Sequence, residues 1–187
     1  KGMESLAKSL GVEIVTNANV EKINVHKGRC IGLMVNGKNY DSDIVVSGAD
    51  YEHSESLLAE EYRQYSDKYW DKKTFAPSSL LFYVGFDKKL KNIEHHNLFF
   101  DTDFDKHAKS IYDNPSWPEE PLFYANFTSK TDPDTAPDGC ENGFFLIPLA
   151  PGIEDNEEIR TLYFNKIITR FERLTGQEVQ NNIIFKQ

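Results

Sequence analysis

Residues 130–148 read KTDPDTAPDGCENGFFLIP, and no other stretch of the chain says more about its structure. The first half contains Asp-Pro, Ala-Pro and Asp-Gly pairs, which favour turns, and the second half is mostly apolar. This pattern predicts a long ordered loop that leads into a buried strand. A loop of this length inside a compact domain usually has a function.

Composition indicates a globular protein without a nucleic-acid partner. The chain has 187 residues, of which 39% are hydrophobic and 13% are aromatic, and its net charge is −9. Phosphate binding needs a basic face, so an acidic chain argues against nucleic acid. No apolar run approaches the roughly 20 residues of a membrane helix, and no signal peptide is visible. Cys30 and Cys140 lack metal-type spacing, so we expect two reduced thiols in a cytosolic protein.

The two ends of the sequence suggest a fragment. Lys1 is not an initiator residue, Met3 lies inside a helical pattern, and residues 182–187 read as a strand in progress. We therefore expect a piece of a longer protein; the alternative is a small complete domain with frayed ends.

The first 50 residues predict a helix, a strand, a three-stranded meander and a returning strand. The helix covers residues 1–10 and ends at Gly11. Asn36-Gly37 is the strongest hairpin signal in the chain. The expected strands are 12–15, 20–26, 30–35, 38–40 and a buried strand over 43–47 that ends at Gly48.

The remaining residues predict an α+β fold, with a mostly antiparallel sheet covered by helices. Residues 51–73 read as helical, with Ser66 capping a second short helix. A long helix over 155–176 is capped by Asp155 or Asn156 and ends at Gly176. The other expected elements are strands over 78–86, 97–100, 122–128, 144–149 and 182–187, and a helix over 106–112.

The loop also carries a family resemblance. With Ser129 before it, the segment resembles the S-K-T-D-P-x-x-A-P-x-G motif of the phytoene desaturase family, the FAD-dependent carotenoid desaturases. The other stretches that resemble this family, in the same order, are 2–6, 19–23, 43–50, 78–79, 83–85 and 95–97. Together these matches extend over nearly the whole chain.

The resemblance implies a fragment of a two-domain flavoprotein. Residues 1–50 would form part of an FAD-binding α/β domain, 51–154 the substrate-binding domain, and 155–187 a helix and strand of the substrate domain that lead back to the FAD domain. The family's G-x-G-x-x-G fingerprint and its C-terminal glycine-rich segment do not occur in this sequence. The chain alone is therefore not expected to hold FAD or to catalyse a reaction.

Four residues are candidates for the cofactor site. In such flavoproteins the residue at Val20 offers its backbone to the adenine, although it could equally be an ordinary strand residue. Ser47, Gly48 and Ala49 end a predicted buried strand, where cofactors bind in open sheets, and Gly48 lets a ligand approach the backbone.

Four further residues are candidates for contact with a substrate: Tyr83, His96, Phe99 and Tyr124. Neighbouring aromatic residues on the predicted strands point to both faces, so the face away from the core needs an apolar cover. A polyene substrate would provide that cover, and a second layer of helices is the alternative.

Metal binding is not expected. Adjacent strand residues point to opposite faces, so His95 and His96 should not chelate one ion together. Residues 101–105 resemble the start of a calcium loop but lack its glycine and its final glutamate, where Lys106 and Tyr112 stand.

The function that the resemblance implies is FAD-dependent desaturation of a carotenoid precursor such as phytoene. No catalytic triad or paired-carboxylate arrangement is recognisable, so no catalytic residue is assigned. A long polyene prefers the bilayer, so we expect a cytoplasmic protein bound peripherally to a membrane surface. The alternatives are a carotenoid or retinoid saturase or isomerase, an amine-oxidase-like flavoprotein, and a non-catalytic lipid-binding module.

Overall fold

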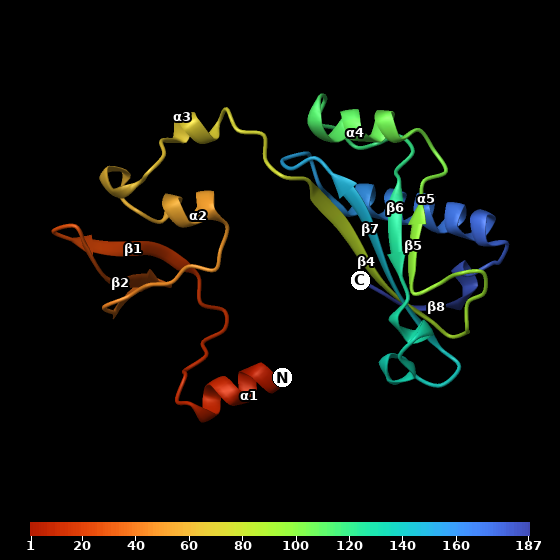
Figure 1. Ribbon diagram of the computed structural model, residues 1–187, viewed down its shortest axis with the longest axis horizontal. Coiled ribbons are helices and arrows are strands. Elements are labelled where there is room, and N and C mark those ends of the chain that lie inside the picture. Colours follow the sequence, from red (N-terminus) through yellow and green to blue (C-terminus); the bar gives the residue numbers. More distant parts are fainter. The chain divides into compact units, whose positions relative to one another are not determined.

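The computed structural model describes residues 1–187, which divide into two compact units, Lys1–Lys73 and Thr74–Gln187. Each unit contains one antiparallel sheet accompanied by helices (Figure 1). The predicted α+β class is thereby confirmed.

The first unit is built on a three-stranded antiparallel sheet. Its strands β1 (Val20–His26), β2 (Arg29–Val35) and β3 (Lys38–Asp41) pair in chain order. Val35 pairs with Lys38, so Asn36 and Gly37 form a two-residue turn, with φ of 47° and 73°. Positive φ at both positions is what this type of hairpin turn needs. The hairpin prediction is confirmed.

Two strands predicted in the first unit are absent. Residues 12–15 and 43–47 are irregular, and the apolar side chains of the second segment are exposed, with Ile44 at 76% and Val46 at 89%. A strand needs a neighbour that satisfies its backbone N–H and C=O groups. The three strands of this sheet pair only with one another, so neither segment has such a neighbour. Apolar composition alone did not reveal this.

Short helices complete the first unit. These are α1 (Gly2–Ser9), α2 (Tyr51–Ser56), the 3₁₀ turn η1 (Glu60–Tyr62) and α3 (Asp67–Trp70). The helical segment predicted over 51–73 is therefore broken, although Ser66 does cap α3 by accepting a hydrogen bond from Tyr69 N–H. Ile23 N–H donates to Leu57 O at 2.9 Å, which ties this segment to β1. The compact units accordingly divide after Lys73, whereas the sequence placed a boundary at residue 50.

The second unit contains a five-stranded antiparallel sheet in the order β5-β6-β7-β4-β8. The long strands β4 (Ser78–Phe86) and β7 (Glu141–Leu149) pair over their whole lengths. The shorter strands are β5 (His96–Phe99), β6 (Phe123–Asn126) and β8 (Ile183–Lys186). Strict alternation of buried and half-buried residues along β7 means that one face of the sheet is covered more closely than the other.

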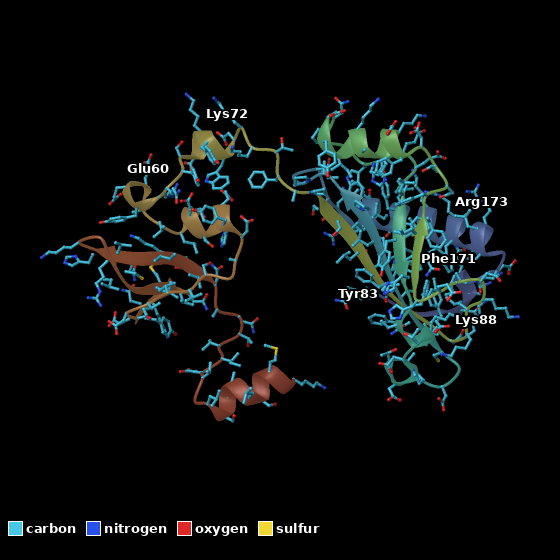
Figure 2. The ribbon with its side chains drawn as sticks, viewed as in Figure 1. Glu60, Lys72, Tyr83, Lys88, Phe171 and Arg173 are labelled. Atoms are coloured by element: carbon cyan, nitrogen blue, oxygen red, sulfur yellow. The ribbon has the colours of Figure 1, made fainter.

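The covered face lies under α5 (Glu157–Thr175), which crosses the sheet in Figure 1. Asn156 caps this helix by accepting from Ile159 N–H, and Gly176 ends it with φ of 65°. Phe171 packs edge-on against Phe145 of β7, and Figure 2 shows Phe171 on the helix. The buried core also includes Phe82, Phe86, Phe123, Phe127, Ile147, Ile167 and Ile168.

The remaining elements connect the sheet. The helix α4 (Phe104–Tyr112) begins after Asp103, whose side chain accepts from Asp105 and Lys106 N–H. Three 3₁₀ turns are η2 (Thr128–Lys130), η3 (Pro133–Thr135) and η4 (Gln180–Asn182). The turns η2 and η3 lie in the loop that leads into β7, as the sequence predicted.

Candidate functional site

The first unit holds a pocket of about 330 Å³ beside β1. The four residues predicted to contact a cofactor, Val20, Ser47, Gly48 and Ala49, all line this pocket. The rest of its wall consists mainly of apolar side chains: Ala18, Ile23, Leu33, Val45, Val46 and Leu57, with Asn19 and His53. Although residues 43–47 are not a strand, Val45, Val46 and Ser47 of this segment line the pocket together with Val20 and Ile23 of β1.

Hydrogen bonds hold the polar side of this pocket in place. Ser47 and Ser54 hydroxyls lie 2.6 Å apart, and Ala49 N–H donates to Ser47 Oγ at 3.3 Å. Asp50 caps α2 by accepting from His53 N–H. A Cβ on Gly48 would meet no atom within 4 Å, so the backbone there is open to a ligand. The pocket can therefore accept a flat apolar ring against exposed backbone.

The second unit offers a different surface, on the sheet face opposite α5. We call it the open face, and it comprises Leu81, Tyr83, His96, Leu98, Tyr124, Asn126, Phe144, Leu146 and Pro148. Phe144 joins its aromatic rings, with centroids 5.3 Å from Tyr83 and 6.3 Å from Tyr124. Tyr83, labelled on β4 in Figure 2, is 50% exposed, and Leu98 is 66% exposed. This much apolar surface on a sheet calls for a partner.

Phe99 does not lie on the open face. Its ring stacks on Phe123 at 4.5 Å and contacts Phe171 of α5, so it packs against the core. The reason is alternation along β5, which sends His96 and Leu98 to one face and Phe99 to the other. The prediction that Phe99 contacts a substrate therefore conflicts with its position.

His95 and His96 are closer than the sequence argument allowed. Their rings are stacked with centroids 4.3 Å apart. Strand alternation does not apply because β5 begins only at His96. His95 Nδ1 lies 2.6 Å from Thr131 Oγ1, so this ring is tied to the loop before β7. The structure contains no group of three or more His, Cys, Asp or Glu side chains placed to hold a metal ion.

A polar cluster stands at one end of the open face. We call His96, Tyr124 and Asn126 the polar triad. His96 Nδ1 lies 2.6 Å from Tyr124 Oη, and Asn126 Nδ2 lies 2.9 Å from Tyr124 Oη and 3.1 Å from His96 Nδ1. The sequence placed His96 and Tyr124 near a substrate but missed Asn126. Asn126 could have been found from register, because it pairs with His96 across β5 and β6.

An apolar pocket of about 220 Å³ lies between α4 and the sheet. Its lining includes Pro148 of the open face, and the sequence interpretation missed this pocket. Its other lining residues are Pro77, Phe100, Phe104, His107, Ala108, Ile111, Tyr112 and Leu122. The available signal was the apolar spacing of Phe104, Ala108 and Ile111 on one helix face.

His107 fastens α4 to the sheet. Its Nδ1 accepts from Leu122 N–H at 2.8 Å, and its Nε2 donates to Pro148 O at 2.8 Å. Burial lowers the pKa of His107 below 6.5, and the nearby Arg170 lowers it further, while the bond to Pro148 opposes this change. A neutral ring is what this pair of contacts requires, since one nitrogen must accept and the other must donate.

The acidic run over 101–105 has structural roles. Asp101 pairs with Arg170 and, at 3.0 Å, with Arg173, both on α5. Burial alone would raise the pKa of Asp101, but the hydrogen bond from Arg170 and the two positive charges lower it. Asp103 caps α4. Both carboxylates are therefore occupied within the protein.

Comparison with curated proteins gives similarity over the whole chain. Carotenoid 3,4-desaturase of Haloarcula japonica is 41% identical over 187 residues, which are 100% of this chain and 38% of that protein. The 1-hydroxycarotenoid 3,4-desaturase of a Flavobacterium species is 30% identical over 95% of this chain and 36% of that protein. Phytoene desaturase of Fusarium fujikuroi is 29% identical over 84% of this chain and 28% of that protein.

The resemblance to the phytoene desaturase family is thus confirmed, and the chain spans about 38% of the length of the first of these relatives. No protein-family model matches the sequence. Among solved structures, an oxidoreductase from Methanosarcina mazei superposes with a TM-score of 0.65 and 16% identity, over 99% of this chain and 40% of that one. This likeness supports the fold. None of the helices combines the length and the apolar character that crossing a membrane requires.

Proposed function

We infer that this segment of a phytoene desaturase family protein comes from an FAD-dependent oxidoreductase that desaturates a carotenoid or carotenoid precursor. The strongest support is the similarity to a carotenoid desaturase over all 187 residues. The names of the relatives are those of enzymes that desaturate or oxidise carotenoids. The physical surfaces of the two units agree with this function, as follows.

The pocket of the first unit fits part of FAD. The apolar walls around Val20 would cover the adenine ring, while exposed backbone at Gly48 would hydrogen-bond to it. This chain contains no G-x-G-x-x-G turn for the pyrophosphate, so these residues form only one wall of the site. We propose that Val20, Ser47, Gly48 and Ala49 are FAD contacts in the full-length protein.

The open face of the second unit fits an extended polyene. Tyr83, Phe144 and Leu146 form an apolar strip on a rigid antiparallel sheet, which would hold a flat conjugated chain in one orientation. When bound, FAD would supply the oxidation by accepting hydride from a saturated carbon–carbon bond. The residues of this chain position the lipid and exclude water from it.

The same lipid chemistry supports binding at a membrane surface. Each buried CH₂ is worth about 0.8 kcal/mol, so a long polyisoprenoid remains in the bilayer until a protein extracts it. Phe100, Phe104 and Tyr112, at the rim of the apolar pocket, are each more than half exposed. We propose that this rim faces the membrane of a cytoplasmic, peripherally bound protein.

Product analysis tests the function directly. The full-length protein is expressed with a pathway that supplies phytoene or later acyclic carotenoids, and the pigments are extracted and identified by mass. We expect products that have lost two hydrogens at each step, together with a flavin spectrum of the purified protein. A flavin-containing protein that leaves every carotenoid unchanged but oxidises amines would refute the proposal.

A further inference from the structure

The polar triad creates a difficulty for a purely hydrocarbon substrate. Apolar residues of the open face adjoin it, with Phe144 paired to Asn126 and Leu98 paired to Tyr124. A polyene that covers this face would also remove the triad from water. Polar groups that lose water without gaining a partner cost free energy, so this end of the face is suited to something other than hydrocarbon.

The hydrogen bonds within the triad fix which of its atoms remain free. His96 Nδ1 lies 2.6 Å from Tyr124 Oη and 3.1 Å from Asn126 Nδ2, which can only donate, so both contacts are compatible with an unprotonated Nδ1 that accepts the Tyr124 hydroxyl proton. A neutral His96 ring therefore carries its proton on Nε2. In the structure neither His96 Nε2 nor Asn126 Oδ1 has a hydrogen-bond partner within the protein. The triad thus presents one donor and one acceptor to a ligand on the open face.

A hydroxyl group matches this pair best. Its oxygen accepts from His96 Nε2–H while its proton goes to Asn126 Oδ1, which satisfies both free atoms. A carbonyl oxygen could only accept and would leave Asn126 Oδ1 unpaired. A hydrocarbon end would satisfy neither atom.

The opposite end of the open face suits a hydrocarbon tail. Phe144 and Pro148 lie four residues apart on β7, about 13 Å at the usual rise of a strand. Pro148 also lines the apolar pocket under α4. A lipid with a hydroxyl at the triad would therefore extend along Phe144 and Leu146 toward that pocket.

We propose that His96, Tyr124 and Asn126 form a hydroxyl-binding site that selects a polyisoprenoid alcohol and fixes its direction on the open face. The proposal rests on the proposed function for the identity of the lipid. Tyr124 is a positioning residue in this site, because its hydroxyl orients His96 and Asn126 and does not itself need to contact the alcohol.

Binding measurements test the site independently of turnover. The flavin-loaded full-length protein is mixed with liposomes containing either an acyclic carotenoid alcohol or the matching hydrocarbon, and the dissociation constants follow from the absorbance of bound pigment. The variants are Tyr124→Phe and Asn126→Leu, with Tyr83→Phe as the matched control. Tyr83→Phe removes a hydroxyl from the same face, but one without a hydrogen-bond partner. Desaturation of both pigments is followed in parallel.

We expect the wild type to prefer the alcohol by about tenfold, the value of one or two net hydrogen bonds. Tyr124→Phe and Asn126→Leu should remove most of this preference, whereas Tyr83→Phe should preserve the ratio. Equal binding of the two pigments by the wild type would overturn the proposal. So would an unchanged ratio in both triad variants, even if those variants melt at lower temperature. Preferential binding without desaturation would support the hydroxyl site and refute only the proposed reaction.

Discussion

Ser129 donates a 2.5 Å hydrogen bond to Glu141, a carboxylate that is only 1% exposed at the start of β7. Glu141 also accepts from Leu90 N–H at 3.2 Å and pairs with Lys130 at 3.2 Å. The first two residues of the S-K-T-D-P motif therefore hold this buried charge. The loop that this motif begins is fixed to the central strand of the sheet by that interaction.

Replacing this carboxylate should destabilise the second unit at neutral pH. Burial alone would raise the pKa of Glu141, but hydrogen bonds from Ser129, Leu90 and Lys130, together with the charge of Lys130, lower it below 4.5. Glu141→Gln leaves Lys130 without its buried partner and should lower the free energy of unfolding by about 3 kcal/mol at pH 7. Denaturant titration measures the loss, with the exposed Glu178→Gln as control.

The pH dependence of that loss has a definite sign. Because the folded-state pKa of Glu141 is depressed, its stabilisation is complete above pH 4.5 and disappears as the pH falls through the folded-state value. The difference in the free energy of unfolding between the wild type and Glu141→Gln should therefore become smaller below pH 4.5. A gap of constant size down to pH 3 would show that ionisation of Glu141 is not its cause.

His107 should make the attachment of α4 to the sheet depend on pH, in a pH range above the one in which Glu141 acts. Its pKa lies below 6.5 in the folded protein, mainly because of burial, so folding favours the neutral ring. Its stabilisation is complete above pH 6.5 and decreases as the pH falls through the folded-state pKa. In His107→Gln this decrease should be absent. At pH 7 the variant should have a free energy of unfolding about 1–2 kcal/mol below that of the wild type, because glutamine makes poorer hydrogen bonds to Leu122 and Pro148.

Chemical denaturation at several pH values from 8 to 5 gives the free energy of unfolding of each protein. The test compares how steeply this free energy changes with pH in the wild type and in His107→Gln. His26→Gln, which changes an exposed histidine in the other unit, serves as the control. If the free energy of unfolding falls equally in His107→Gln and the wild type between pH 7 and pH 5, the contacts of His107 with Leu122 and Pro148 do not make the attachment of α4 depend on pH.

Local signals in the sequence predicted those features that depend on neighbouring residues in the chain. Asn156 and Gly176 mark the two ends of α5, and the turn at Asn36-Gly37 follows from its two residues alone. Gly32 shows the limit of such signals. A Cβ there would lie 2.0 Å from Tyr40 O on β3, a contact that depends on register and cannot be read from Gly32 itself.

The residues of the candidate sites also divide into those that the sequence identified and those that depend on how the strands pair. Val20 was identified through the family resemblance and the segment 47–49 as the end of a predicted buried strand, and both line one pocket. The exposed segment 43–47 and the core-facing Phe99 were misjudged because both depend on pairing partners and strand phase. Asn126 was missed since its role arises only when β5 and β6 are aligned.

The turn at Asn36-Gly37 should not tolerate a β-branched residue. Gly37 has φ of 73°, a region that valine avoids, so Gly37→Val should cost about 1–3 kcal/mol. Gly37→Asn is the matched variant, because asparagine accepts this region far more readily. Thermal melts should rank the proteins as wild type, Gly37→Asn, then Gly37→Val. Equal melting of Gly37→Val and the wild type would place the turn elsewhere and change the register of β2 and β3.

Gly48 allows the cofactor pocket to be filled without disturbing the fold. A side chain at this position meets no atom within 4 Å, and its φ lies outside the left-handed region, so Gly48→Leu should fold normally. The leucine would occupy space that we assign to FAD. Overfilling a contact surface costs about 1–3 kcal/mol, so flavin affinity of the full-length protein should fall about tenfold.

Gly2→Leu adds the same side chain at another unobstructed glycine, outside the pocket, and should retain flavin. Flavin absorbance per protein measures occupancy, and circular dichroism confirms folding. A folded Gly48→Leu protein with wild-type flavin affinity would mean that the pocket beside β1 does not contact FAD.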